Sequence, residues 1–155
     1  WLKDMCDEFK QVFAFEPVKE VRDCLYENVK AKNFTCYDYG LGSAEETKKI
    51  NYIPSETGNS YISNDGNKEI QIKRLDSLDL PHIDYIKIDA EGFEIEVVKG
   101  ATELIESYKP FIHVEVKDKI LVKQGLKSND ITKCFDDINY ELKLKFKSEN
   151  VYGPK

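Results

Sequence analysis

Two carboxylates directly follow an apolar strand pattern in the middle of the chain. Asp89 and Glu91 come after the strand pattern at residues 85–88, and Glu115 lies within the next apolar run, at residues 111–116. Open α/β sheets bind ligands at the carboxyl ends of their strands, which is where these acids are expected to lie. Such carboxylates can act as a general base, position a ligand or hold a metal ion. Acids on two successive strands favour a functional site over a solvated surface.

A lysine, Lys87, interrupts the strand pattern just before these acids. A central strand of a parallel sheet is normally apolar on both faces, so a lysine there needs an explanation. Either its side of the strand opens onto a cavity, or Lys87 pairs with a neighbouring acid such as Asp89 or Glu115. Both explanations require a polar pocket. Glu91 has a plainer alternative role, because an acid also stabilises the first turn of the helix that follows.

Further candidates end predicted strands nearer the N-terminus. Glu16 ends the strand predicted for residues 11–15, and an acid at this place in a doubly wound fold commonly binds ribose hydroxyls. It could equally be a carboxylate that complements the helix dipole ahead of Pro17. Asp38 and Tyr39 end the next strand, where an acceptor group and an apolar ring could hold an adenine. An ordinary turn acid is the better explanation of Asp38 on local sequence alone.

The spacing of apolar residues predicts an α/β fold around these candidates. Strand patterns at residues 11–15 and 34–39 flank a helix pattern at 18–29, which predicts parallel pairing through a right-handed crossover. Helical spacing at residues 93–108 separates the acidic motif from the strand at 111–116. The acids are therefore placed where strands give way to loops and helices.

Residues 45–75 interrupt this alternation and predict an antiparallel insertion. Turn signals at residues 57–60 and 64–67 are followed by alternating Ile70 and Ile72. Loops of this kind often carry substrate contacts, so a mobile loop between the strands of the insertion is expected to contact the ligand.

The C-terminal part predicts a helix and two strands. The helix covers residues 129–137 with Ser128 as its cap, and the strands cover 140–147 and the region near Val151. The lysines at 143–147 are typical of the solvated face of an edge strand.

Bulk composition indicates one globular domain, residues 1–155. The chain is 41% hydrophobic and 34% charged, which excludes a disordered protein. Its net charge of −6 argues against a nucleic-acid partner, and no apolar run is long enough for a membrane span. The four cysteines lack CxxC spacing, which favours reduced thiols and a cytoplasmic location over a disulfide framework or a zinc site.

Several motifs, in order along nearly the whole chain, resemble the FkbM family of methyltransferases. They are Phe13-Ala14-Phe15-Glu16-Pro17, Leu25 with Asn28, Leu41-Gly42, Leu75-Asp76-Ser77-Leu78, the IKIDAEGFE stretch within residues 83–94, Lys109-Pro110 and Glu115. The FEP and IKIDxEGxE elements together are quite specific. The resemblance implies a Rossmann-like, doubly wound, mostly parallel sheet with the antiparallel insertion. It also implies S-adenosylmethionine as the methyl donor and a hydroxyl acceptor on a sugar or small molecule.

The resemblance also implies a role for each candidate near the cofactor. Glu16 and Pro17 would bind the cofactor at its ribose. Asp38 and Tyr39 would flank the adenine. No metal ligand is implied, and a divalent ion has no support in the sequence.

On the acceptor side the implied roles fall on the central acids and their neighbours. Asp89, Glu91 and Lys87 would form the catalytic group beside the sulfonium and the acceptor oxygen. Glu115 and Ser60 would contact the acceptor molecule, with Ser60 on a loop that closes over it.

One departure from the family pattern concerns the donor site. Family members begin with a strand and a glycine-containing loop that cradles the methionine part of the cofactor, and no such loop precedes Phe13. In a sheet of order 3-2-1-4-5 that strand is central, between the Glu16 strand and the Asp89 strand. We therefore expect an N-terminally truncated methyltransferase domain. As an isolated chain it should bind S-adenosylmethionine poorly, which calorimetry would test.

Two other functions remain open at this stage. Asp89 with Glu115 and Lys117 is similar to the D…ExK pattern of metal-dependent nucleases and phosphodiesterases, in which acids hold magnesium and a lysine positions water. The negative net charge counts against that function. A non-catalytic binding domain on the same Rossmann-like fold is the third hypothesis, because fold does not fix function.

Overall fold

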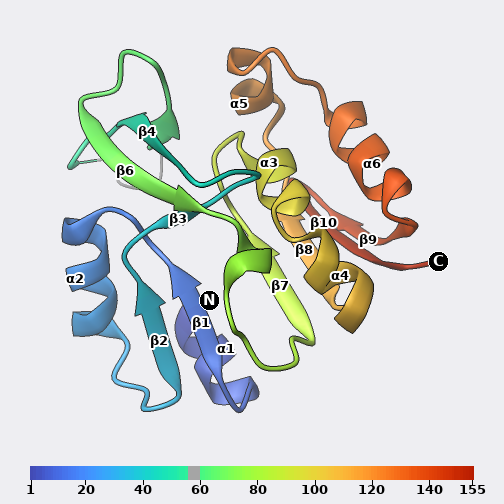
Figure 1. The fold of residues 1–155 in the computed structure, drawn as a ribbon, viewed down its shortest axis with the longest axis horizontal. Coiled ribbons are helices and arrows are strands. Elements are labelled where there is room, and N and C mark those ends of the chain that lie inside the picture. Colours follow the sequence, from blue (N-terminus) through green and yellow to red (C-terminus); the bar gives the residue numbers. More distant parts are fainter. Residues whose placement is uncertain (56–59) are drawn as a thin grey trace.

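The computed structural model describes residues 1–55 and 60–155. The described residues form an α/β structure of three small sheets with short helices between them (Figure 1). The helices are α1 (Leu2–Glu8), α2 (Lys19–Asn28), α3 (Glu94–Lys99), α4 (Thr102–Tyr108), α5 (Asp118–Lys123) and α6 (Ser128–Asp137), with a 3-10 turn at Leu75–Ser77. The strands are β1 (Val12–Phe15), β2 (Phe34–Tyr37), β3 (Gly40–Leu41), β4 (Glu46–Asn51), β5 (Tyr61–Ile62), β6 (Lys68–Lys73), β7 (Tyr85–Ile88), β8 (Phe111–Glu115), β9 (Tyr140–Phe146) and β10 (Glu149–Pro154).

The N-terminal strands β1 and β2 pair in parallel, with α2 as their connection. This confirms the strand, helix, strand order predicted from the sequence. The second strand ends at Tyr37, earlier than expected, because the chain turns there. Residues 40–41 then join a different sheet, as β3 beside β6.

The middle of the chain forms the sheet β3-β6-β4-β5. Strand β4 is antiparallel to both β5 and β6, whereas the short strand β3 is parallel to β6. Its buried residues, Ile50, Tyr52, Ile70 and Ile72, pack against Val18 at the start of α2. Part of the turn signal at residues 57–60 lies outside the described residues.

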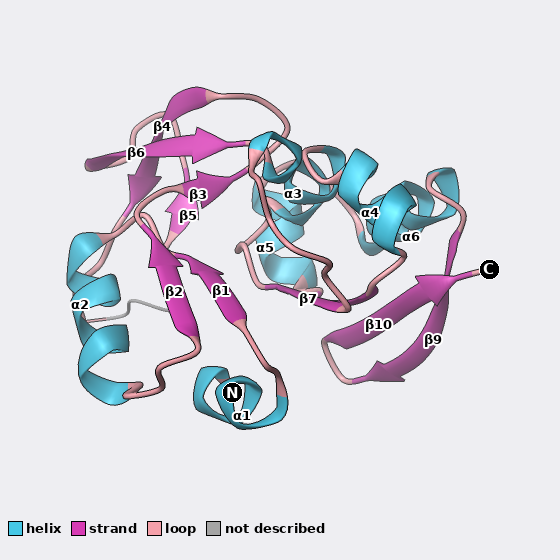
Figure 2. Cartoon of the chain, turned by 60° about the horizontal axis from the view of Figure 1, so that its bottom comes forward, coloured by secondary structure: helices cyan, strands magenta, loops and turns pink. Residues whose placement is uncertain are grey.

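The C-terminal sheet has the order β7-β8-β10-β9 and carries the main core. Strands β7 and β8 are parallel, and β10 is antiparallel to both β8 and β9. Helices α3, α4 and α6 gather on one face of this sheet (Figure 2). Ile112 and Val114 of β8 are fully buried beneath them.

The opposite face of this sheet is polar near β7. Strand alternation places Lys87 of β7, His113 of β8 and Glu149 of β10 on this face, away from the apolar core. At the edge, β9 is exposed along its length after Tyr140, which agrees with the prediction of an edge strand.

The α/β class is confirmed, and the sheets are mixed. Strands β4 to β6 are antiparallel within the region where an antiparallel insertion was expected, and the β9–β10 hairpin adds a further antiparallel pair. Helix α5 was not predicted, since its six residues are too few to show helical periodicity. Ser128 is the first helical residue of α6 instead of its cap, and the Asp130 carboxylate accepts a hydrogen bond from the Lys127 N–H at 2.8 Å.

The helices of the described part are all short. None of them has the length and apolar character needed to cross a membrane.

Candidate functional site

The acidic motif forms a tight turn at the carboxyl end of β7. Glu91 and Gly92 both have a positive φ, of 48° and 97°, so the turn has two successive left-handed residues. Glycine adopts this conformation readily, whereas a glutamate there is uncommon. The buried Glu94 carboxylate accepts hydrogen bonds from the N–H groups of Gly92, at 2.9 Å, and Ala90, at 3.2 Å. Glu94 thereby fixes the backbone that presents the two acids before it.

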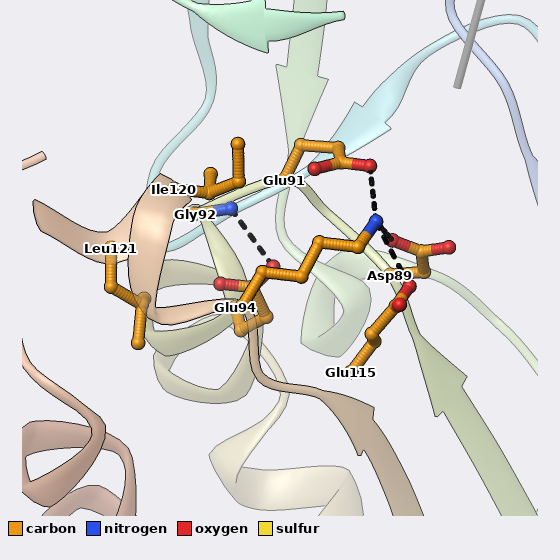
Figure 3. Close-up of a pocket in the computed structure, with 8 residues that line it drawn as sticks. Asp89, Glu91, Gly92, Glu94, Glu115, Ile120 and Leu121 are labelled. Atoms are coloured by element: carbon orange, nitrogen blue, oxygen red, sulfur yellow. Dashed lines mark hydrogen bonds and ion pairs between the residues drawn. The ribbon is translucent and has the colours of Figure 1, made fainter. Parts of the chain in front are cut away.

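The Lys117 ammonium group lies within 4.0 Å of three carboxylates, those of Asp89, Glu91 and Glu115, which Figure 3 labels. Its Nζ lies 2.7 Å from Glu91 Oε1, 3.1 Å from Glu115 Oε2 and 4.0 Å from Asp89 Oδ1. Asp89 and Glu91 come from the turn after β7, while Glu115 ends β8. Because β7 and β8 are adjacent and parallel, their carboxyl ends bring these acids to one edge of the sheet, as the sequence predicted.

The surroundings of Asp89 and Lys117 shift the pKa of each of these two groups. Burial first, and then the charge of Glu115, raise the pKa of Asp89 from 3.8 to about 6, although Lys117 opposes the shift. Partial burial alone would lower the pKa of Lys117, but its hydrogen bonds to Glu91 and Glu115 outweigh this and hold the pKa above its ordinary value. Asp89 is therefore a carboxylate that can accept a proton near neutral pH, beside a lysine that stays charged.

Glu91 is more deeply buried than its neighbours. Its side chain is 9% exposed, compared with 34% for Asp89 and 17% for Glu115. One oxygen accepts the hydrogen bond from Lys117, but the other, Oε2, has no hydrogen-bond partner among the described residues.

Lys87 belongs to a second polar group, deeper along the same strands. Its Nζ donates a hydrogen bond to Glu149 Oε2 at 2.6 Å, and His113 Nε2 lies 2.7 Å from the same oxygen. The other ring nitrogen of His113 lies 2.7 Å from the Tyr85 hydroxyl. Burial alone would raise the pKa of Glu149, but the Lys87 hydrogen bond and the nearby cations hold it below its ordinary value. The partner of Lys87 is thus Glu149, which sequence reasoning did not single out.

Glu16 lies at the end of β1 and holds the start of α2. Its Oε1 accepts a hydrogen bond from the Val18 N–H at 2.8 Å, and Arg22 donates to its backbone oxygen at 2.8 Å. Burial raises the pKa of Glu16, although the Val18 hydrogen bond and the charge of Arg22 oppose the shift. The helix role considered from the sequence is therefore present. Pro17, next to Glu16, is half-buried.

Asp38 and Tyr39 have different surroundings. Asp38 is exposed, whereas Tyr39 is buried. The Tyr39 ring packs near Phe15, with ring centroids 5.9 Å apart, and Lys73 Nζ lies 4.3 Å from its centre. The Tyr39 ring is thus in contact with other side chains on more than one side.

Ser60 directly precedes β5, and this strand lies beside the segment that follows α5. Gln124 Nε2 donates a hydrogen bond to the Ile62 carbonyl at 3.0 Å. Ile120 and Leu121 of α5 line the cleft around Asp89, Glu91 and Lys117 (Figure 3). The insertion therefore approaches the acidic cleft through α5.

Sequence reasoning missed two residues of the cleft. Lys117 was considered only for a nuclease, although it lies two residues beyond Glu115 and its position after a strand end was the available signal. Glu94 was quoted within the motif without a role. Its hydrogen bonds depend on the left-handed turn, which residue types do not reveal.

The described residues contain no group of three or more His, Cys, Asp or Glu side chains arranged to hold a metal ion. In the acidic cleft, the ammonium group of Lys117 occupies the position between the carboxylates.

Comparison with known proteins identifies the family. The sequence model of the methyltransferase FkbM domain matches residues 1–143. The chain belongs to this family. A curated relative, the hexuronic acid methyltransferase AglP of Haloferax volcanii, is 29% identical over 140 residues, which cover 86% of this chain and 56% of the relative. The chain thus spans a little over half the length of that relative.

A solved structure supports the fold. The crystal structure of methyltransferase FkbM from Methylobacillus flagellatus matches with a TM-score of 0.56 and 19% identity, over 94% of this chain and 36% of that chain. At this identity the similarity concerns the fold alone. The family expected from the sequence is confirmed, and nothing in these comparisons favours a nuclease.

Proposed function

We propose that this chain carries the acceptor side of an S-adenosylmethionine-dependent methyltransferase that methylates a hydroxyl group on a sugar. The observation that supports this most strongly is the group of Asp89, Glu115 and Lys117 at the carboxyl ends of β7 and β8, in a member of this family. The hexuronic acid methyltransferase relative supports a sugar acceptor.

The residues of the cleft suit proton removal from a hydroxyl. S-adenosylmethionine, when bound, supplies the electrophilic methyl group. Asp89 would take the proton of the acceptor hydroxyl as that oxygen receives the methyl group. Lys117 holds the neighbouring carboxylates and stays charged, while alignment of the reacting atoms supplies most of the catalysis.

Glu16 fits the proposed contact with the cofactor ribose. It is a half-buried carboxylate at the carboxyl end of β1, and only one of its oxygens is needed to hold α2. Asp38 is exposed nearby in sequence and could accept a hydrogen bond from the adenine. Tyr39 would contribute to the adenine site through its packing with Phe15, because its ring is buried. Proposed roles for Lys87 and Ser60 are indirect, through Glu149 and through the β5 side of the cleft.

We also propose that β2, β1, β7 and β8 belong to one Rossmann-like sheet in the whole protein. Within the described residues β1 pairs with β2 alone and β7 pairs with β8 alone, which leaves one edge of each strand for a further parallel strand. Phe9 and Tyr85 have ring centroids 5.7 Å apart, so the segment before β1 lies close to β7.

A cytoplasmic location is proposed as well, because all four cysteines are free thiols.

The direct test is made on the full-length protein. Calorimetric titration should reveal binding of S-adenosylmethionine, and Glu16→Gln should weaken it by about tenfold while keeping the hydrogen bond to α2. Transfer of a labelled methyl group to a sugar hydroxyl should accompany binding. Absence of binding by the full-length protein would reject the proposed function.

A further inference from the structure

Lys87 lies on the same face of the C-terminal sheet as the acids at the strand ends. Lys87 of β7 pairs with His113 of β8, and Glu115 of β8 pairs with Glu149 of β10. Asp89 directly follows the last paired residue of β7, which brings it beside Glu115. Side chains two residues apart on a strand point to one face. A row of three acids therefore lies next to Lys87 and His113 on this face.

The Lys87 side chain reaches past the nearer acids to a more distant one. Its Nζ lies 2.6 Å from Glu149 Oε2, on a strand that β8 separates from β7. Asp89 is only two residues further along the chain from Lys87, and Glu115 lies on the adjacent strand. Long side chains can contact such diagonal neighbours on one face of a sheet. Within the described part of the chain, however, Lys87 forms its ion pair with Glu149. The position of Glu149 therefore determines where the charge of Lys87 lies.

Contacts with His113 and Tyr85 hold the Glu149 carboxylate in place. His113 Nε2 lies 2.7 Å from the Glu149 oxygen that accepts the hydrogen bond from Lys87. The other ring nitrogen of His113 lies 2.7 Å from the Tyr85 hydroxyl. The Lys87 side chain is 9% exposed, so water and salt screen its ion pair less than a pair on the surface. These contacts fix the ammonium group of Lys87 at Glu149.

The ionisation of Asp89 depends on the charged groups that face it. Glu91 lies in its own turn, Glu115 faces it from β8, and Lys117 faces it from the segment after β8. Burial and the two acids raise the pKa of Asp89, and Lys117 opposes the shift. A second cation within about 4–6 Å would lower the pKa of a carboxyl by about one to three pH units. The place of Lys87 on this face therefore matters for Asp89.

We propose that Glu149 is a positioning residue of the methyl-transfer site, which holds the ammonium group of Lys87 away from Asp89 and so keeps Asp89 available as a proton acceptor. Without the charge of Glu149, Lys87 would turn to Asp89 or Glu115. A carboxylate that faces two cations is a weaker base than one that faces Lys117 alone. This inference rests on the proposed function for the role of Asp89, and it adds to that site a residue from outside the acidic motif.

Titration of the Asp89 carboxyl tests this inference. NMR of the full-length protein with isotope-labelled aspartate follows the titration, and Asp89→Asn assigns the signal. Glu149→Gln keeps the shape of the side chain and removes its charge. In this variant the midpoint of the Asp89 titration should fall by about one pH unit, because Lys87 is released towards Asp89. The pH below which methyl transfer declines should fall by a similar amount.

A double variant shows whether Lys87 is the cause. Lys87→Met combined with Glu149→Gln has no lysine to release and should restore the wild-type midpoint. Glu141→Gln is the matched control, because Glu141 is 53% exposed on β9 and pairs with Lys143, and it should leave the midpoint unchanged. An unchanged midpoint in Glu149→Gln would overturn the inference, and so would a lowered midpoint that persists in the double variant.

Two further measurements complete the test. If Glu149→Gln does not fold, Glu149→Asp replaces it, because the shorter side chain withdraws the carboxylate from Lys87, and the midpoint should again fall. The NMR titration requires no catalysis, so it separates the two proposals. Normal methyl transfer with an unshifted midpoint would reject the role of Glu149 alone. A shifted midpoint in a protein that does not bind S-adenosylmethionine would reject the proposed function.

Discussion

The two polar groups on the C-terminal sheet differ in how completely their charges are paired. In the inner group, Lys87 and His113 converge on one Glu149 oxygen, and Tyr85 completes the chain of contacts. In the outer group, one lysine serves three carboxylates, and an oxygen of Glu91 lacks a partner among the described residues. His113 Nε2 also makes no hydrogen bond among the described residues, so the groups differ in their balance of charge: one lysine faces one carboxylate in the inner group and three in the outer group.

This difference separates a structural role from a functional one. Buried polar groups that only support a fold are normally satisfied by the protein itself. An unbalanced group with a raised pKa at Asp89 is typical of a site that completes its contacts with a ligand. We infer that the inner group holds the strands in register beneath the outer group, for which we propose contact with the acceptor.

The largest expected effect is on catalysis, at the outer group. Asp89→Asn should lower methyl transfer by the full-length protein by about 10²- to 10⁴-fold, because the amide cannot take the hydroxyl proton. Initial rates with labelled S-adenosylmethionine measure this loss. Calorimetric affinity for the cofactor should change far less, and a variant with near wild-type rates would remove Asp89 from the proposed mechanism.

A substitution in the inner group should lower the free energy of unfolding. Glu149→Ala leaves the largely buried Lys87 without its partner and should cost about 1.5–3 kcal/mol of unfolding free energy. Urea denaturation provides the measurement. The double variant Lys87→Met with Glu149→Leu serves as control, because replacing both charges by apolar groups should restore most of the loss. If Glu149→Ala is as stable as wild type, the inner group has no supporting role.

The Glu94 carboxylate has both a structural and a functional effect, because it fixes the turn that carries Asp89 and Glu91. Glu94→Ala removes the acceptor for two buried N–H groups and should cost about 1–3 kcal/mol. Glu94→Gln retains a side-chain oxygen and should cost less. Thermal unfolding of the pair gives the comparison, and equal stability of the two variants would show that the hydrogen bonds to the turn are unimportant.

The ionisation of Asp89 should appear in pH profiles. Methyl transfer should fall as pH decreases through about 6, where the carboxylate gains a proton. Because the folded-state pKa lies above the unfolded value, the ionised group destabilises the fold above pH 6, and this cost disappears as pH falls towards 3.8. Asp89→Asn should therefore be more stable than wild type by about 1 kcal/mol at pH 7.5, after allowance for solvent screening, and equally stable near pH 4. A stability difference that is independent of pH would contradict the raised pKa.

The smallest effect is expected at an exposed pair that belongs to neither group. Lys19 and Asp23 form an ion pair of 2.6 Å on the surface of α2. Lys19→Ala should change the unfolding free energy by no more than about 0.5 kcal/mol, because water screens exposed charges. Urea denaturation in parallel with Glu149→Ala compares an exposed pair with a partly buried one. A similar loss of unfolding free energy in both variants would show that burial does not account for the difference between the two pairs.

Much of the local structure could be predicted from residue patterns. The strand at 11–15, the helix at 18–29 and the strand around Tyr85–Ile88 were close to β1, α2 and β7, since each has a clear apolar period. The placement of Asp89 and Glu115 at one sheet edge also followed, because successive parallel strands bring their carboxyl ends together. The two-residue strand β3 and the short helix α5 have no such period and were missed.

The sequence by itself determined which residue types stand at the strand ends and which family the motifs belong to, because both are properties of order along the chain. Only the tertiary structure decided the charge partners. Lys87 pairs with Glu149, which is 62 positions away, and Lys117 occupies the position beside Asp89 that Lys87 was considered for. The partner of a long side chain depends on distances across neighbouring strands and on burial. The local spacing of residues along the sequence determines neither of these.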